Sequence, residues 1–575
     1  MKKLLVYMKD YKKESILGPL FKLLEASFEL LVPLVVSAII DVGIANRDVP
    51  YIVCMVLLMV ALGVIGLVCS ITAQYFAAKA AVGFTAKVRS ALFAHIQSLS
   101  YTEMDTMGTS TLITRMTSDM NQVQNGVNLV LRLFLRSPFI VFGAMIMAFT
   151  IDVKSAMVFV VTIPALSIVV FGVMLISMPL YKKVQAGLDR ILRRTRENLS
   201  GVRVIRAFNK EESEIQQFDE ENRQLTKMQM FVGRISALMN PITYVIINVA
   251  TLVLIWTGAW QVESGILTQG QVVALVNYMS QILVELIKLA NLVITVTKAW
   301  ACANRIESIF DQQSSMQYPK QSVQEDPIAD VITFENVGLT YKNAGAESLS
   351  NLNFSIHRGQ TVGIIGGTGA GKTSLVNLIP RFYDASQGRV LVNGVDVREY
   401  PQDQLRDKIG IVPQKAVLFG GSIADNLRWG KEDATREELM DALRISQAEE
   451  FVEKREGGID AMVAQNGKNL SGGQRQRLTI ARALVRKPEI LILDDSASAL
   501  DYATDAKLRK AIRQMDPSVT VLIVSQRAAS IQYADQIIVL DDGEAVGIGT
   551  HQELLQNCPV YQEIYYSQFP KEVQA

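Results

Sequence analysis

Six long apolar segments constrain the fold of this chain more than any other feature of its sequence. A helix needs roughly 20 apolar residues to cross a bilayer, and each segment reaches that length. They lie near residues 16–44, 53–78, 129–151, 155–180, 231–261 and 271–299. The third is the weakest, because Arg132 and Arg136 stand near its start. The sequence therefore predicts an all-α membrane domain of six helices within residues 1–310.

The distribution of lysine and arginine orients the six predicted spans. Two long connections, 79–128 and 181–230, are rich in these cations, whereas the short connections hold few. By the positive-inside rule, the long connections and both termini lie in the cytoplasm. Their composition predicts long helical extensions of the adjoining spans, with short crossing helices at the tips, near Tyr101–Thr114 and Ala207–Glu214. We expect these tips to dock onto a soluble domain.

Several carboxylates fall inside the predicted spans, where a charge is costly. Glu25 and Glu29 share one face of the first span, and Glu285 stands three residues before Lys288 in the last. These groups either face a substrate or ion path or form structural ion pairs, such as Glu285 with Lys288. Asp41, at the outer end of the first span, either latches the external mouth or ends the helix in water. The pattern leaves these alternatives open.

The composition argues against several other classes of protein. A net charge of +1 gives no electrostatic case for binding nucleic acid. The four cysteines and three histidines lack the spacing of a metal or redox site, so free thiols are expected. The chain opens with the basic and apolar run Met1–Leu5, but charges from Asp10 onward interrupt it before an apolar core forms. A cleaved signal peptide is therefore rejected.

A second domain follows the predicted spans. Residues 311–330 are polar and contain two prolines, which is typical of a linker. Residues 331–575 read as an α/β domain. Within it, the apolar strand 361–365 precedes Gly366-Gly367-Thr368-Gly369-Ala370-Gly371-Lys372-Thr373, the strand–loop–helix context of a P-loop. Its glycines let backbone N–H groups converge on phosphate, Lys372 is expected to neutralise the β- and γ-phosphates, and the Thr373 hydroxyl to ligate Mg²⁺.

A second apolar strand, Glu489–Asp494, ends in a carboxylate. This is the Walker B arrangement that accompanies a P-loop, and Asp494 is expected to reach Mg²⁺ through water. Together, the two motifs predict an ATP-binding domain that uses ATP and Mg²⁺.

Over its full length the chain resembles an ABC transporter half of the six-helix exporter type. The resemblance rests on motifs in the family's order and spacing, and it implies a role for each. Tyr341 would stack on adenine, Gln414 would touch Mg²⁺ and sense the membrane domain, and Asp501 would belong to the D-loop. The ATP-binding set is completed by Gly366, Thr368, Gly369, Gly371, Lys372, Thr373 and Ser374. The signature, which would cover the ATP of a partner chain, is Leu470, Ser471, Gly472, Gly473 and Gln474.

Two hydrolytic positions depart from the family pattern. The residue after Asp494 is usually a glutamate that polarises the attacking water, and here it is Asp495. Its side chain is one methylene shorter, and a misplacement of about 1 Å can cost ~10²-fold in rate. The switch position, usually histidine, is Gln526, which cannot carry a proton near neutral pH. Both positions are thus weakened while the signature is intact.

A chain with a weakened hydrolytic site and an intact signature suits one half of an asymmetric transporter dimer. The chain resembles the degenerate-site subunit of bacterial heterodimeric multidrug exporters. The expected partner is a second, non-identical half-transporter that supplies Glu and His opposite this chain's signature, and a blunted signature opposite its P-loop. A homodimer that tolerates Asp495 and Gln526 is the alternative.

The resemblance implies ATP-driven export of hydrophobic or amphipathic compounds, among them drugs, across the cytoplasmic membrane. Methionine and phenylalanine in the spans, such as Met145, Met147 and Phe149, suit an adaptable apolar cavity, although such residues also serve packing. Lipid or peptide export by the same architecture remains open. An ATP-gated regulatory subunit is a further alternative, which the weakened positions motivate and the intact signature disfavours.

Overall fold

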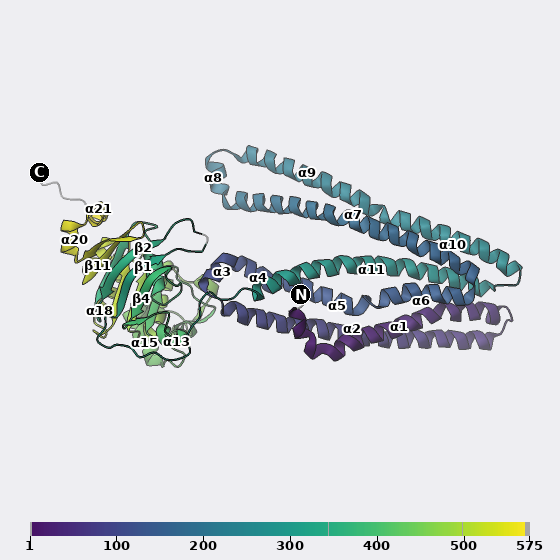
Figure 1. Ribbon diagram of the computed structural model, residues 1–575, viewed down its shortest axis with the longest axis horizontal. Coiled ribbons are helices and arrows are strands. Elements are labelled where there is room, and N and C mark those ends of the chain that lie inside the picture. Colours follow the sequence, from purple (N-terminus) through teal and green to yellow (C-terminus); the bar gives the residue numbers. More distant parts are fainter. Residues whose placement is uncertain (1–2, 343, 497, 570–575) are drawn as a thin grey trace. The chain divides into compact units, whose positions relative to one another are not determined.

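The structure is a computed structural model that describes residues 3–342, 344–496 and 498–569, and they divide into two compact units. The first unit combines the chain up to Gln97 with Ser110–Gln312. The second combines Ser98–Thr109 with the chain from Gln313 onward. Figure 1 shows long helices in the first unit and layered strands and helices in the second. The predicted fold class, a six-helix membrane domain followed by an α/β domain, is confirmed.

From Lys3 onward, the first unit consists of helices and their connections. Its elements are η1 (Leu4–Tyr11), α1 (Lys12–Ala38), η2 (Ile39–Ile44), α2 (Val49–Gln97), α4 (Thr109–Thr114), η3 (Arg115–Asp119), α5 (Met120–Leu133), α6 (Arg136–Ile151), α7 (Val153–Ser200), α8 (Val202–Ala207), α9 (Glu211–Ala237), α10 (Met239–Glu263) and α11 (Gln269–Phe310).

Among the described residues, six helical runs of this unit are long and apolar enough to cross a membrane, which makes the chain a multi-pass membrane protein. They are Leu4–Ile44, Val49–Gln97, Thr109–Ile151, Val153–Ser200, Glu211–Glu263 and Gln269–Phe310. Each predicted span lies inside one run, and most runs extend well beyond it, so the predicted helical extensions are confirmed. Toward α8, the α7–α9 pair separates from the other helices of the unit (Figure 1).

One predicted tip has to be corrected. The short helix at the second tip is α8, Val202–Ala207, and α9 already begins at Glu211, so the predicted crossing helix at 207–214 is wrong. Gly201 at the amino end of α8, with φ −93° and ψ 10°, ends α7 there. A glycine at the end of a helical pattern is a stop signal that the sequence interpretation passed over.

Polar side chains fix the ends of the long helices. Asp152 caps α7 by accepting a hydrogen bond from the Ser155 backbone N–H at 2.7 Å. Asp41 accepts hydrogen bonds from the Thr268 hydroxyl at 2.6 Å and the Gly270 N–H at 2.7 Å, at the start of α11. It also accepts one from Ser37 at 2.9 Å. Asp41 therefore ties the outer end of the first span to the last within this chain.

The second unit contains α3 and the α/β domain. Its helices are α3 (Tyr101–Met107), α12 (Lys372–Leu378), α13 (Gln402–Asp407), α14 (Ile423–Arg428), α15 (Arg436–Ile445), α16 (Glu449–Glu453), η4 (Gly458–Asp460), η5 (Gln465–Gly467), α17 (Gly472–Val485), α18 (Tyr502–Arg513), α19 (Ala528–Ile531), α20 (His551–Asn557) and α21 (Pro559–Gln568). Its strands are β1 (Ile332–Leu339), β2 (Leu349–Ile356), β3 (Thr361–Gly366), β4 (Gln387–Val392), β5 (Val395–Asp396), β6 (Ile409–Val412), β7 (Gly421–Ser422), β8 (Met462–Val463), β9 (Ile490–Asp494), β10 (Thr520–Val524), β11 (Gln536–Asp541) and β12 (Glu544–Gly549).

The strands of this unit form a large mixed sheet, an antiparallel sheet and one short pair. The large sheet has the order β12-β11-β3-β10-β9-β6 and is parallel except for its edge strand β12. Strands β9 and β10 are buried throughout, as expected for parallel strands covered on both faces. The antiparallel sheet has the order β2-β1-β4-β5. In a parallel sheet, ligands bind beyond the carboxyl ends of the strands, and β3 and β9 both end at this edge.

Candidate functional site

The loop between β3 and α12 has the backbone geometry of a phosphate cradle. Gly369 and Gly371 adopt φ of +89° and +91°, a left-handed conformation that glycine adopts without a steric cost. At Gly371 a Cβ atom would also lie 2.8 Å from the carbonyl oxygen of Ser348. The Lys372 ammonium group lies over this loop and donates to the carbonyls of Gly366 at 2.9 Å and Gly367 at 2.6 Å.

Two oxygen-bearing side chains from different elements meet beside this loop. The Thr373 hydroxyl, at the start of α12, lies 3.0 Å from one carboxylate oxygen of Asp494, at the end of β9. Oxygen ligands of this kind are those that Mg²⁺ prefers. Burial, reinforced by the nearby Asp495 charge, raises the pKa of Asp494. A divalent cation beside Asp494 would stabilise the charged carboxylate and lower its pKa. The pair of Thr373 and Asp494 therefore fits a magnesium ion.

Asp495 holds an uncommon backbone conformation. Its φ is +46°, which few residues other than glycine adopt and which asparagine and aspartate tolerate best. Its carboxylate accepts a 3.4 Å hydrogen bond from the Gln414 side-chain amide. Burial raises the pKa of Asp495, while Gln414 and then Lys372 oppose the rise. Such conformations concentrate at functional sites, where surrounding contacts hold them.

The burial of Lys372 has an electrostatic consequence. Its pKa is lowered, because burial disfavours the ammonium form, and Asp495 and Asp494 oppose the shift. The pocket thus holds one cation, Lys372, and two carboxylates with raised pKa values. A further cation, such as the metal ion that accompanies a nucleotide, would be stabilised there.

A cavity of about 350 Å³ joins most of the predicted ATP residues. Its lining includes Thr368, Gly369, Gly371, Lys372, Thr373, Ser374, Gln414, Asp494, Asp495 and Gln526. Gly366 stands at the carboxyl end of β3, where its carbonyl accepts from Lys372. Five further lining residues were not predicted: Glu347, Ser348, Val524, Asp542 and Gly543. Glu347 and Ser348 directly precede β2, Val524 ends β10, and Asp542 and Gly543 form the turn between β11 and β12. None of these segments carries a motif for ATP binding.

Tyr341 lies at the edge of the same region. Its hydroxyl donates a 2.9 Å hydrogen bond to the Ser374 hydroxyl in the first turn of α12. Its ring packs edge-on against Tyr383, with centroids 5.1 Å apart and an interplanar angle of 89°. The Tyr383 hydroxyl donates at 2.6 Å to Asp105 of α3, and burial, aided by Asp105, raises the pKa of Tyr383. Sequence reasoning missed Tyr383, because its partner Asp105 is 278 residues away.

The signature residues stand apart from this cavity. None of Leu470–Gln474 is among the described residues that line it. Ser471 caps α17 in a capping box: it accepts from the Gln474 N–H at 3.2 Å, and the Gln474 side chain accepts from the Ser471 N–H at 3.0 Å. Asp501 caps α18 in a similar way, accepting from the Thr504 N–H at 2.9 Å. The signature therefore forms a capped helix N-terminus that does not contribute to the cavity at its own P-loop.

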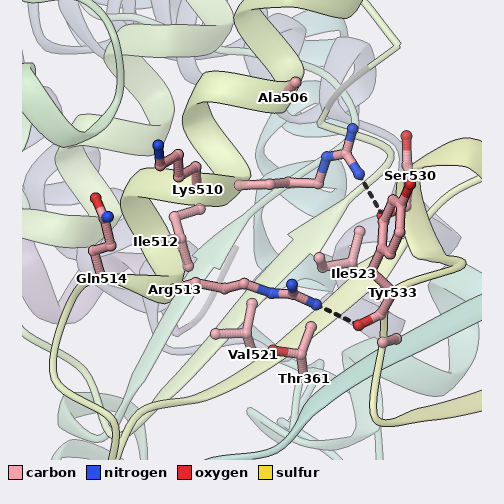
Figure 2. A pocket seen from close by; sticks show the side chains of 12 residues that line it. Thr361, Ala506, Lys510, Ile512, Arg513, Gln514, Val521, Ile523, Ser530 and Tyr533 are labelled. Carbon is pink, nitrogen blue, oxygen red and sulfur yellow. Dashed lines mark hydrogen bonds between the residues drawn. The ribbon is translucent and has the colours of Figure 1, made fainter.

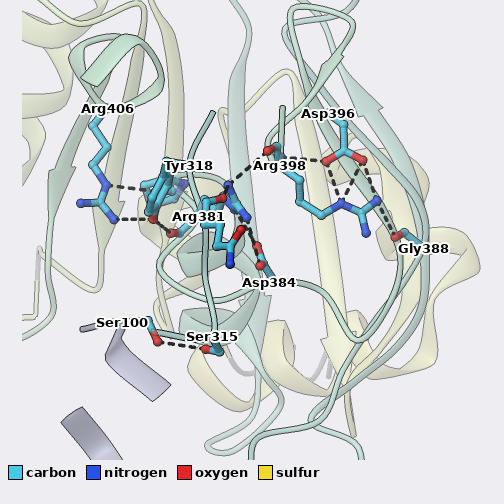
Figure 3. Close-up of polar contacts among 11 residues, drawn as sticks. Ser100, Ser315, Tyr318, Arg381, Asp384, Gly388, Asp396, Arg398 and Arg406 are labelled. Atoms are coloured by element: carbon cyan, nitrogen blue, oxygen red, sulfur yellow. Dashed lines mark hydrogen bonds and ion pairs between the residues drawn. The ribbon is translucent and has the colours of Figure 1, made fainter. Parts of the chain in front are cut away.

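The tip helix α3 and the segment before β1 are both fastened to the nucleotide unit. Glu103 of α3 is buried and accepts a hydrogen bond from the Ser315 backbone N–H at 3.3 Å. The ring of Tyr318 lies between two guanidinium groups, 4.7 Å from Arg381 and 5.7 Å from Arg406 (Figure 3). Burial raises the pKa of Tyr318, and the two arginines oppose the rise. The first predicted tip thus packs against the soluble domain.

A separate cavity of about 290 Å³ lies between α18 and the amino ends of β3 and β10. Its lining combines apolar side chains with Arg509, Lys510 and Arg513, and Arg513 donates to the Tyr533 carbonyl (Figure 2). The described residues that line it include none of the predicted ATP residues, so it does not belong to the candidate site.

Comparison with known proteins agrees with this geometry. The family described as the ABC transporter transmembrane region matches residues 15–286, and the family described as ABC transporter matches residues 349–498. An uncharacterized ABC transporter ATP-binding protein of Mycobacterium tuberculosis is 37% identical over 98% of this chain and 97% of its own length. The Bacillus subtilis protein named "Putative multidrug export ATP-binding/permease protein YgaD" is 30% identical over 98% of each chain.

A solved structure shares the fold. The structure of a bacterial Atm1-family ABC exporter with ATP bound superimposes with a TM-score of 0.79, covering 98% of this chain and 100% of its own, at 23% identity. With the six membrane-spanning runs, the P-loop unit and full-length relatives above 30% identity, this chain belongs to the ABC transporter family, as an exporter half-transporter whose ATP-binding domain implies ATP hydrolysis coupled to transport.

Proposed function

We propose that this chain is the hydrolysis-impaired half of a heterodimeric ABC exporter. The observation that carries the proposal is the lining of the nucleotide cavity. Asp495 and Gln526 face it at the positions where the family places its glutamate and histidine, while the signature on α17 keeps a complete capping box. A site with a short carboxylate and no titratable switch residue binds nucleotide and hydrolyses it slowly.

The chain's own residues suit ATP retention. Gly369 and Gly371 shape the loop so that its backbone N–H groups would face phosphate, and Lys372, which here donates to the loop carbonyls, would bind the β- and γ-phosphates. Thr373 and Asp494 would hold Mg²⁺, with Gln414 nearby, and the ion would neutralise charge on the phosphates. Asp495 holds the Gln414 amide at 3.4 Å, so it contributes to positioning even where it is a poor base.

Two exposed surfaces support assembly with a second half-transporter. The tip around α8 has no buried residue and exposes Val204 and Phe208. In the nucleotide unit, a groove of about 700 Å³ is lined by Phe419 and Trp429, whose exposed rings stack at 4.4 Å. Exposed apolar groups of this kind mark interaction sites. We propose that the α8 tip enters the corresponding groove of the partner, and that this groove receives the partner's tip.

The substrates we propose are hydrophobic or amphipathic compounds, drugs among them. The YgaD relative is named for multidrug export, and ABC exporters act on hydrophobic substrates in the bilayer. The predicted orientation places the nucleotide unit and both termini in the cytoplasm, so transport would run outward across the cell membrane. This proposal keeps the domain boundaries predicted from the sequence. They are a membrane domain to residue 310, a linker at 311–330 and a nucleotide domain from residue 331.

Pairing is tested by comparing the chain alone with the chain co-expressed with a second half-transporter from the same genome. We expect the chain alone to hydrolyse ATP at least about 10²-fold more slowly than the pair, because Asp495 and Gln526 serve its own site. The measurement is phosphate release in detergent and in proteoliposomes. If the purified chain by itself forms a dimer with brisk hydrolysis that Asp495→Asn abolishes, the heterodimer proposal is wrong and the homodimer is right.

Tyr341 gives a prediction for nucleotide affinity at this chain's site. Tyr341→Ala should weaken ATP binding about tenfold or more, because stacking on a base contributes about 1–3 kcal/mol. Tyr341→Phe, which keeps the ring and loses the hydrogen bond to Ser374, should weaken it less than about threefold. Photolabelling with an azido-ATP, followed by separation of the two chains on a gel, reports this site alone. Equal losses in the two variants would contradict adenine stacking.

A further inference from the structure

A network of ionisable side chains lies where α1, α6 and α11 pack inside the membrane unit. Glu285 of α11 is 2% exposed and accepts three hydrogen bonds. They come from Arg136 at 2.6 Å, the Ser137 hydroxyl at 2.7 Å and Lys288 at 2.8 Å. Arg136 is also buried. Glu285 therefore uses most of its hydrogen-bonding capacity within the bundle, and it holds the arginine in an apolar environment that would otherwise exclude it.

The outer members of the network, Glu29 and Lys288, make fewer hydrogen bonds than Glu285. Arg136 reaches past Glu285 to Glu29 of α1, where it donates at 2.7 Å. That is the one hydrogen bond found for the Glu29 carboxylate among the described residues, and its side chain is 40% exposed. The Lys288 side chain is 41% exposed and donates to Glu285 alone among the described residues. Glu29 and Lys288 thus keep most of their hydrogen-bonding capacity.

Both groups line one cavity of about 360 Å³ between α1 and α11. Glu285 lines it as well, and its uncharged polar lining is Asn277, Ser280 and Gln281. The side-chain oxygen of Gln281 is buried with no hydrogen-bond partner among the described groups. Buried polar atoms are nearly always paired. Gln281 offers an unpaired acceptor, and Glu29 and Lys288 each have further hydrogen-bonding capacity. Together these three groups indicate a polar ligand. Binding sites of this size are common.

A neighbouring ion pair shows what a purely structural arrangement looks like in this bundle. Lys22 and Glu25 of α1 lie 2.5 Å apart, both largely buried, and Lys22 also donates to Ser70 of α2 at 3.0 Å. They do not line the cavity. Glu29 and Lys288 differ from this pair because both line the cavity and keep hydrogen-bonding groups without a partner among the described residues there. A purely structural ion pair would not be stabilised by such exposure.

Charge balance decides which ligand fits. Arg136 and Lys288 carry two positive charges, and Glu29 and Glu285 carry two negative ones, so the network is neutral as a whole. A ligand with a single net charge would bring an uncompensated charge into the bundle, which is costly. A ligand with an ammonium group for Glu29 and an acidic group for Lys288 would bring none. The remaining lining, Val32, Pro33, Val36 and Val284, is apolar.

We infer that this cavity binds the polar head of a zwitterionic amphiphile, with its cationic group on Glu29 and its anionic group on Lys288. The inference rests on the proposed export function, because it names a class of compound that the transporter would move. Either a two-chain membrane lipid or a single-chain soluble amphiphile carries such a head, and both are tested.

The test uses fluorescent amphiphiles that share one acyl chain and differ in the head: phosphocholine, trimethylammonium and phosphate monoester. A two-chain phosphocholine lipid is the fourth probe. Equilibrium binding without nucleotide is measured on the full chain, as the complex it forms in membranes, in lipid nanodiscs and relative to empty nanodiscs. Glu29→Gln keeps an acceptor for Arg136 and removes the charge. Lys288→Gln removes the cation, and Lys298→Gln, an exposed lysine on the same helix outside the cavity, is the control.

We expect the wild type to bind the phosphocholine probe about tenfold tighter than either the purely cationic or the purely anionic probe. Lys288→Gln should lose about five- to tenfold for phosphocholine and prefer trimethylammonium, and Glu29→Gln should show the same loss and prefer phosphate. Lys298→Gln should match the wild type. A head-group order that is the same in the wild type and both variants, or no binding above empty nanodiscs, overturns the inference. The fourth probe shows which chain number is accepted.

Uptake of the same probes into inside-out vesicles separates this inference from the proposed function. If ATP drives uptake of all probes equally, whatever their head group, the proposed export function stands and the inference about the head-group site is wrong. Binding that follows the head group as predicted, without ATP-driven uptake of any probe, keeps the inference and counts against export.

Discussion

Replacing Ser471 with arginine is expected to lower ATP hydrolysis and transport by the assembled exporter at least about 10²-fold, because the signature would complete the partner's active site. Ser471, at the N-terminus of α17, does not line the cavity at its own P-loop. An arginine at this position would occupy the place of a phosphate of the partner's ATP. Phosphate release and dye uptake in proteoliposomes measure the effect.

Two matched variants make this result specific. Ser471→Thr keeps the capping hydroxyl and should keep most of the activity, while the loss of the cap in Ser471→Arg costs only about 1 kcal/mol, too little to unfold the domain. Asp495→Asn should lower hydrolysis by the pair less than about threefold, because the partner's site carries most turnover. Asp495→Asn as damaging as Ser471→Arg would show that this chain's own site is the fast one.

Much of the fold follows from local sequence. A membrane span is a contiguous apolar run, and a P-loop is a contiguous strand, turn and helix, so residues near one another in sequence carry the information. Gly369, Gly371 and Lys372 could be placed from their spacing, and the structure gives the two glycines the positive φ that the loop needs. The ligand roles of these residues remain predictions.

Contacts between distant segments could not be predicted. Arg136 made the third span look like a weak candidate, because a charge in a span needs a partner. Its partners, Glu285 and Glu29, are 149 and 107 residues away in the sequence, so the sequence alone could not identify them. The ion pair of Glu285 with Lys288, one of the alternatives that the sequence left open, is present at 2.8 Å, but it is only part of the network. Likewise, Ser98–Thr109 belongs with the nucleotide unit through contacts such as Glu103 with Ser315, 212 residues away. A linear division of the chain cannot show this.

The buried pair of Arg136 and Glu285 gives the second large prediction. Glu285→Ala should destabilise the membrane unit by about 3 kcal/mol or more, because breaking a buried ion pair leaves one charge uncompensated. The remaining bond from Arg136 to Glu29 places the expected value at the lower end of the ~3–5 kcal/mol range found for such pairs. Unfolding in mixed micelles, followed by circular dichroism, measures the difference.

A double replacement distinguishes the cost of an unpaired charge from the loss of a packed side chain. Arg136→Met with Glu285→Leu removes both charges and fills similar volume, so it should recover most of the stability that Glu285→Ala loses. Glu263→Ala, at the exposed end of α10, should change stability by less than about 0.5 kcal/mol. If Glu285→Ala is no more damaging than Glu263→Ala, the network does not hold α6 against α11. If the double variant is as unstable as Glu285→Ala, packing rather than charge accounts for the loss.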